Sequence, residues 1–158
     1  MPAARPPATL VAPEHVLMDA MRSATFAFKG WLSEILPRHG LGMAQFWTLT
    51  DLAEHGPINA AHLASFRCVT PPTVSVIVDE LVRAGWVERH RSESDRRVVV
   101  LSVTPAGRSL IAELWEQVGQ RTTEATRDIP RKEIETTARV LSSFGGLPEA
   151  VVAAGGSA

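Results

Sequence analysis

Arginine side chains crowd a short polar segment in the second half of the chain, and they are the groups best suited to bind an anionic partner. Arg89, Arg91, Arg96 and Arg97 lie close together, and an apolar run over residues 98–103 follows directly. An Arg guanidinium can bond a phosphate at two points and can also enter a narrow A·T minor groove. The pattern predicts two short strands joined by a tight loop, which together form an exposed β-hairpin that binds DNA. The alternative is a solvated hairpin with ordinary surface charge.

The residues before this hairpin are arranged as two short helices joined by a brief connection. The second helix, over residues 71–84, places Val74, Val78 and Leu81 on one buried face. The first begins after Asn59, which is a good N-cap. Two such helices form a helix-turn-helix, and the hairpin behind them makes it a winged helix. The residues expected to face base edges, at the N-terminal end of the second helix, are Thr70, Pro72, Thr73, Ser75 and Val76.

Amphipathic segments surround this unit, with apolar residues at helical spacing over 14–36, 43–54, 105–127 and 130–144. The predicted fold class is mainly α with a small β-hairpin wing: a winged helix-turn-helix with N- and C-terminal dimerisation helices. The terminal helices are not needed to complete a winged helix, so we expect a two-fold symmetric dimer to bury their apolar stripes. The alternative is packing against the winged helix of the same subunit. The predicted organisation is a disordered arm (1–12), a helical dimerisation region (13–36 and 105–144), a winged-helix DNA-binding region (37–104) and a flexible tail (145–158).

Composition excludes several classes of protein. Of the 158 residues, 45% are hydrophobic and 21% are charged, which is typical of a globular protein. The sequence has no apolar run of about eighteen residues and no apolar segment of secretory type at its start. We therefore expect a cytoplasmic protein without a membrane partner. The net charge is only −1, but five of the 16 Lys and Arg residues lie between positions 83 and 97, and screening makes this local cluster matter more than the total.

Taken in order, the motifs of this chain resemble the MarR family of bacterial transcriptional regulators. The combination that carries the resemblance is Gly-x-Val-x-Arg at 85–89, Asp-x-Arg at 95–97 and Thr-x-x-Gly at 104–107, within a match over residues 41–110. It implies a homodimer of winged-helix subunits that binds a pseudopalindromic DNA operator. It also implies transcriptional regulation, most often repression, with release from DNA when a small and often aromatic effector binds. We expect these properties here, and we expect no enzyme activity.

The same resemblance assigns roles to side chains of the wing. It implies that Arg97 enters the minor groove and that Asp95 helps to orient it. A carboxylate two residues away can hold a guanidinium at a fixed angle, and the cation suits the negative potential of a narrow groove. Arg96 and Arg91 are expected to contact phosphates, which position a protein without reading sequence.

Two positions leave the DNA-binding prediction less defined. Arg89 has two possible roles, a DNA contact or a structural ion pair with Glu88 or Glu93. The family often has a cation after the Ser of the recognition helix, whereas this chain has Val76 there. Without that cation, the helix is not expected to recognise guanine strongly. The wing is therefore expected to contribute more of the affinity for DNA.

Aromatic residues lie on the helices that flank the family's effector cleft. They are the expected lining of an effector cleft in this chain, although aromatic residues at helical spacing also build cores. The five residues are Phe28, Trp31, Phe46, Trp47 and Trp115.

The single cysteine and the histidines are the residues on which a redox, enzymatic or metal-binding role would depend. Cys68 lies in the helix-turn-helix connection, where we expect a buried apolar side chain and no redox role. A thiol hydrolase built on Cys68 with His62 or His90 lacks any nucleophile elbow. The histidines show no ligand spacing, so no metal or cofactor is expected. A winged helix used only for protein–protein contact is the other alternative, which the Arg-rich wing disfavours.

Overall fold

The computed structural model describes residues 12–67, 69–92 and 95–145. The chain divides into two compact units, one that ends at Val118 and one that begins at Gly119. The predicted disordered arm (1–12) and flexible tail (145–158) lie outside the described residues, apart from Ala12 and Gly145.

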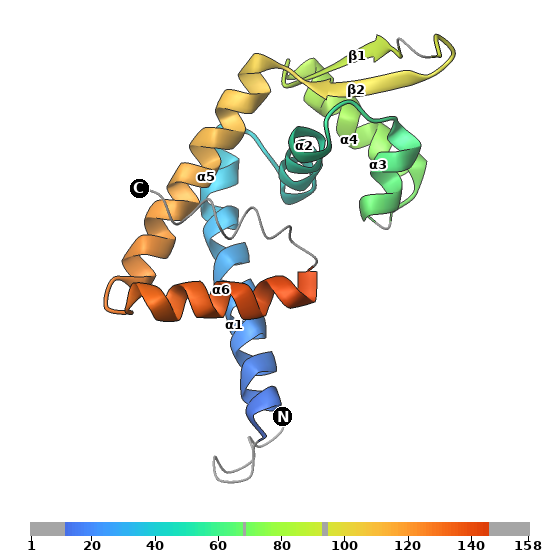
Figure 1. Cartoon of the computed structure of the whole chain (residues 1–158). Helices are drawn as coiled ribbons and strands as arrows, with labels where there is room; N and C mark the ends of the chain where they lie inside the picture. Colours follow the sequence, from blue (N-terminus) through green and yellow to red (C-terminus); the bar gives the residue numbers. More distant parts are fainter. Residues whose placement is uncertain (1–11, 68, 93–94, 146–158) are drawn as a thin grey trace, which may run out of the picture. The chain divides into compact units, whose positions relative to one another are not determined.

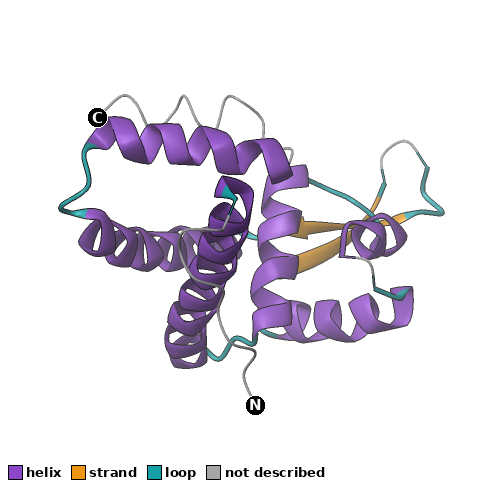
Figure 2. Cartoon of the chain, turned by 90° about the horizontal axis from the view of Figure 1, so that it is seen from below, coloured by secondary structure: helices purple, strands orange, loops and turns teal. Residues whose placement is uncertain are grey.

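The described part of the chain consists of helices and one β-hairpin, so the predicted fold class is confirmed (Figures 1 and 2). The elements in chain order are α1 (Pro13–Ile35), the 3-10 helix η2 (Leu36–His39), α2 (Met43–His55), α3 (Ala60–Arg67), α4 (Pro71–Arg83), β1 (Val87–Arg91), β2 (Val99–Val103), α5 (Pro105–Thr126) and α6 (Arg131–Gly145).

Local sequence explains where most helices begin and end. The first helix stops at Ile35, one residue earlier than expected, because Pro37 has no N–H with which to continue the α-helical ladder. Asn59 caps α3 as predicted, since its Oδ1 accepts a hydrogen bond of 2.8 Å from the backbone N–H of His62. After α4 the chain turns at Gly85, whose φ of 76° is a left-handed conformation that favours glycine.

The hairpin is antiparallel and is held at the middle of β2 by a third segment. Val87 pairs with Val103 and Arg91 with Val99. Ile58, in the connection between α2 and α3, forms a β-bridge with Leu101 through two backbone hydrogen bonds of 2.8 and 3.3 Å. Because Ile58 immediately precedes the helix-turn-helix, this bridge anchors the wing to the unit that carries the recognition helix.

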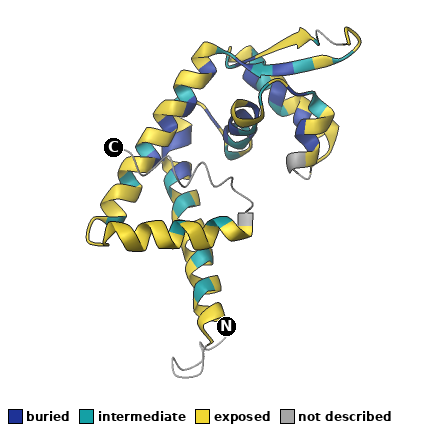
Figure 3. Ribbon diagram, viewed as in Figure 1, coloured by how far each residue is buried: buried dark blue, intermediate teal, exposed yellow. Residues whose placement is uncertain are grey.

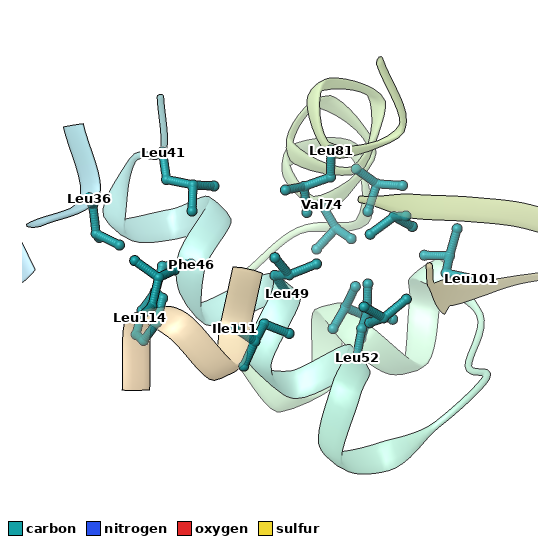
Figure 4. Packing of buried hydrophobic residues seen from close by; sticks show 14 of the residues in the cluster. Leu36, Leu41, Phe46, Leu49, Leu52, Val74, Leu81, Leu101, Ile111 and Leu114 are labelled. Atoms are coloured by element: carbon teal, nitrogen blue, oxygen red, sulfur yellow. The ribbon is translucent and has the colours of Figure 1, made fainter. Parts of the chain in front are cut away.

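One hydrophobic core joins all elements of the first unit, and its buried residues concentrate in α2, α4, the base of the hairpin and the first half of α5 (Figures 3 and 4). The largest buried side chains are Leu32, Ile35, Leu36, Phe46, Leu49, Leu52, Leu63, Leu81 and Leu114. In the hairpin, Val87, Leu101 and Val103 are buried, whereas Arg89 and Arg91 are exposed. The core therefore fixes the base of the wing and leaves its tip in solvent.

The turn into α5 packs closely against the end of the helix-turn-helix. The Thr104 hydroxyl donates to the carbonyl oxygen of Gly85 at 2.7 Å and accepts from the backbone N–H of Gly107 at 3.1 Å, as an N-cap does. The backbone N–H of Thr104 donates to the carbonyl oxygen of Trp86 at 3.0 Å. The Thr-x-x-Gly motif thus joins the start of α5 to the turn between α4 and β1.

The second unit contains the end of α5 and all of α6. Its surface ion pairs are local, between Arg127 and Glu124 at 2.7 Å and between Arg131 and Glu135 at 2.9 Å. Large apolar side chains are exposed on and before α6, namely Ile129, Ile134, Val140, Leu141 and Phe144.

Candidate nucleic-acid interface

The N-terminal half of α4 presents the predicted DNA-facing side chains to solvent. Its buried face carries Val74, Val78 and Leu81, which belong to the core. All five predicted recognition residues are exposed: Thr70, Pro72, Thr73, Ser75 and Val76. Val76 is 60% exposed. The surface of this half-helix is therefore neutral and carries methyl and hydroxyl groups.

Thr70 differs from the expected N-cap in one respect. Its backbone has the extended conformation of an N-cap, with φ −79° and ψ 148°, but its side chain bonds no backbone N–H of the helix. The hydroxyl oxygens of Thr70 and Thr73 instead lie 2.9 Å apart and share a hydrogen bond. Ser75 donates to the carbonyl oxygen of Pro71 at 3.0 Å. These hydroxyls are partly engaged within the protein, which increases the share of methyl groups among the contacts that α4 can offer.

The wing presents its arginines on the exposed side of the hairpin. Arg89, Arg91, Arg96 and Arg97 are all exposed. Arg91 donates from Nη1 to the backbone carbonyl oxygen of Arg96 at 3.1 Å, which ties the guanidinium across the turn and leaves further N–H donors free to bond a phosphate.

Arg89 forms an ion pair with a residue that the sequence did not suggest. Its Nη2 lies 2.6 Å from Oδ1 of Asp79 on α4, so neither of the two expected partners on the wing is the one observed. Glu88 lies on the same strand, and Glu93 lies outside the described residues. An ion pair is one of the two roles open to Arg89 from the sequence, and the packing of α4 against the hairpin brings Asp79 beside it.

Asp95 organises the loop through the backbone rather than through a guanidinium. Its Oδ1 accepts a hydrogen bond of 2.9 Å from the backbone N–H of Arg97, and its carbonyl oxygen accepts one of 2.9 Å from Val98. This is the local turn that an Asp side chain forms with the amide two residues ahead. The implied carboxylate–guanidinium contact is therefore replaced by a contact that fixes the chain direction at Arg97.

Four of the five predicted effector-cleft residues form a cluster of aromatic rings. Phe28 of α1 lies 6.0 Å from Trp47 and 6.2 Å from Trp115 between ring centroids, and Phe46 lies 5.0 and 5.7 Å from the same two rings. Phe46 is fully buried and belongs to the core, whereas Trp115 is 38% exposed. Trp31 is half-buried and, within the described residues, takes no part in these ring contacts. The cluster joins α1, α2 and α5.

The remaining candidate chemistry adds little to this site. Cys68, on which the alternative thiol hydrolase depends, lies outside the described residues. His90 Nε2 lies 3.4 Å from the hydroxyl oxygen of Ser102 within the hairpin. Among the described residues, no three His, Cys, Asp or Glu side chains gather in a group that could hold a metal ion. No helix in the described ranges has both the length and the apolar character needed to cross a bilayer.

Sequence reasoning missed two polar contacts that hold α4 in place. They are the Asp79–Arg89 pair and a hydrogen bond of 2.7 Å from Gln45 of α2 to the neighbouring Glu80. One feature of the sequence could have indicated these contacts. Asp79 and Glu80 are adjacent acids on a helix expected to face anionic DNA, where unpaired carboxylates would be unfavourable.

The comparisons agree with this architecture. Residues 41–99 match the model of the MarR family. YcgE of Bacillus subtilis, named an uncharacterized HTH-type transcriptional regulator, is 31% identical over 95 residues, which are 60% of this chain and 59% of that protein. This chain thus spans less than two thirds of the length of that relative.

Solved structures share the fold over most of the chain. The crystal structure of RV1404 from Mycobacterium tuberculosis has a TM-score of 0.74 and 26% identity, over 87% of this chain and 97% of that one. A mutant MarR from E. coli complexed with operator DNA has a TM-score of 0.62 and 26% identity, over 84% and 94% of the two chains.

The fold and the exposed Arg-rich hairpin define a winged helix-turn-helix protein. With the match over its central part, the chain belongs to the MarR family.

Proposed function

We propose that this protein is a transcriptional regulator that binds double-stranded DNA with α4 and the wing. The observation that carries the proposal is the combination of an exposed neutral half-helix with exposed arginines on the neighbouring hairpin. A helix of this kind fits the major groove, where a methyl group such as that of Val76 can pack on thymine. The wing arginines suit phosphates and a narrow minor groove, with Arg97 as the groove-inserted side chain.

The proposed active form is a homodimer that binds a pseudopalindromic operator. Support comes from the exposed apolar side chains near both ends of the described chain, among them Phe26 of α1 and Phe144 of α6, which are 72% and 63% exposed. Apolar side chains scattered singly are common on a monomer, whereas several exposed together on one helix, as on α6, are typical of a surface that a second subunit covers. Two recognition helices related by a two-fold axis would then read half-sites about one helical turn apart, roughly 34–36 Å.

The proposed mode of control is repression that a small aromatic effector relieves. The aromatic cluster of Phe28, Trp47 and Trp115 supports the choice of ligand class, because partly exposed rings can stack on another ring. The effector would act by binding more tightly to a dimer whose recognition helices are wrongly spaced for DNA. A tenfold loss of DNA affinity requires about 1.4 kcal/mol of such preference.

Selection from a random duplex library with the full-length protein tests this proposal. We expect enrichment of two inverted half-sites with centres about 10 base pairs apart, and binding that weakens steeply as salt rises. The competing proposal, a winged helix that contacts only proteins, predicts no enriched sequence and no salt-dependent binding to duplex DNA. That result would sink the DNA-binding function.

A further inference from the structure

An acidic residue occupies the surface of α4 that the proposed function places in the major groove. Asp79 lies one helical turn beyond Val76 on the same exposed face of α4. A free carboxylate at this place would repel DNA phosphates and lower affinity. In the structure it is paired with Arg89, at 2.6 Å between Oδ1 and Nη2, and the two side chains are 54% and 41% exposed.

The Asp79–Arg89 pair joins two elements that must contact DNA together. Asp79 belongs to α4 and Arg89 to β1, and the pair lies between the buried base of the hairpin and its exposed tip. Buried Val87 and Val103 fix the base of the wing, and the Ile58–Leu101 bridge holds β2 at the position opposite Arg89. The charge-assisted hydrogen bond of Arg89 adds a restraint that joins β1 directly to α4.

A second contact restrains the other side of the same helical turn. Glu80 accepts a hydrogen bond of 2.7 Å from Nε2 of Gln45, and Oε1 of Gln45 accepts one from the backbone N–H of Gly42. The amide of Gln45 thus links the start of α2 to α4. The two adjacent acids hold α4 between the wing and α2, so the orientation of α4 is fixed where the wing departs.

We propose that Asp79 and Arg89 are positioning residues that set the angle between the recognition helix and the wing, and that neither is a DNA contact. This inference rests on the proposed DNA-binding function. Arg89 therefore differs from Arg91, Arg96 and Arg97, although all four are close in sequence and exposed.

The size of the effect follows from the free energy of an exposed ion pair. Without the pair, the wing samples other directions, and the apparent affinity falls by the fraction of molecules that keep the competent one. Exposed pairs are worth little, so neutralising either partner is expected to weaken operator binding about two- to fivefold. Once the pair is broken, removing the second partner causes no further loss.

A double-mutant cycle on the full-length protein tests the proposal, with Asp79→Asn, Arg89→Gln and the two combined. Binding to the selected operator is measured by fluorescence anisotropy over a range of salt concentrations. We expect each single variant and the double variant to lose the same two- to fivefold, with an unchanged salt slope. Asp79→Asn is decisive, because simple charge repulsion predicts tighter binding for this variant.

Matched variants separate the possible outcomes. Glu88→Gln removes the same charge from the opposite face of β1 and is expected to leave affinity within about twofold of wild type. Arg96→Ala, as a proposed phosphate contact, is expected to reduce the salt slope by about 0.9. An Asp79→Asn variant that binds as tightly as wild type, or an Arg89→Gln variant that reduces the salt slope as Arg96→Ala does, overturns the positioning role. If the wild type itself selects no sequence, the proposed function fails first, and the two failures are thereby distinguished.

Discussion

Gly107 is the position at which a single methyl group is expected to do most damage to the fold. An added Cβ would lie 2.3 Å from the carbonyl oxygen of Trp86 and 2.8 Å from Cγ1 of Val103. Non-bonded carbon and oxygen atoms pack no closer than about 3.3 Å, so α5 and the Trp86 turn would have to separate by about 1 Å. The obstructing atom is backbone, held by the Thr104 hydrogen bond of 3.0 Å, and cannot rotate away.

The magnitude follows from what this separation breaks. Overpacking a close contact destabilises a protein by about 1–3 kcal/mol. The shift also strains the hydrogen bonds of Thr104 to Trp86 and Gly85, and each lost bond contributes about 0.5–1.5 kcal/mol. We therefore expect Gly107→Ala to lower the free energy of unfolding by roughly 2–6 kcal/mol.

Gly119→Ala is the matched control, because the same substitution in the same helix meets no heavy atom within 4 Å. Alanine favours a helix more than glycine does, so this variant is expected to be more stable by about 0.5–1 kcal/mol. Urea unfolding followed by circular dichroism, at one fixed protein concentration, measures both variants against wild type. An ordinary surface substitution changes the free energy of unfolding by up to about 0.5 kcal/mol. If Gly107→Ala changes it by no more than this, α5 does not approach Trp86 as closely as described.

Three further predictions concern the interface, the subunit contact and the effector. Arg97→Ala is expected to weaken operator binding at least about fivefold, because a charged hydrogen bond contributes about 1 kcal/mol or more. The free energy of unfolding in urea is expected to stay within about 0.5 kcal/mol of wild type, because the side chain is exposed. Equal affinities of wild type and variant would show that Arg97 is not part of the interface. Leu141→Asp places a charge in the exposed apolar stripe of α6 and is expected to convert a dimer to a monomer in sedimentation velocity, whereas an unchanged dimer would place the contact elsewhere. Salicylate-like aromatic acids are expected to quench the fluorescence of Trp47 and Trp115 and to release DNA, with Trp115→Phe reducing the quenching. A panel of such acids that does neither would point to another effector class.

The sequence by itself determined the elements and their order, because the signals for them are local. The spacing of Val74, Val78 and Leu81 identified the buried face of α4, and the Asn59 cap and the Gly85 turn marked where helices begin and end. These features depend on residues three or four positions apart, or on the backbone preference of a single residue. The exposure of the recognition residues followed from the same periodicity.

Tertiary structure alone decided which polar groups meet. Arg89 pairs with an acid 10 positions away on another element, and Gln45 bonds an acid 35 positions away. Other acids lie nearer in sequence, such as Glu88 beside Arg89, so spacing does not identify the partner. The choice comes from how α2, α4 and the hairpin pack on the shared core. That packing also made Phe46 part of the core, and only the close approach of α5 to Trp86 explains why residue 107 must be glycine.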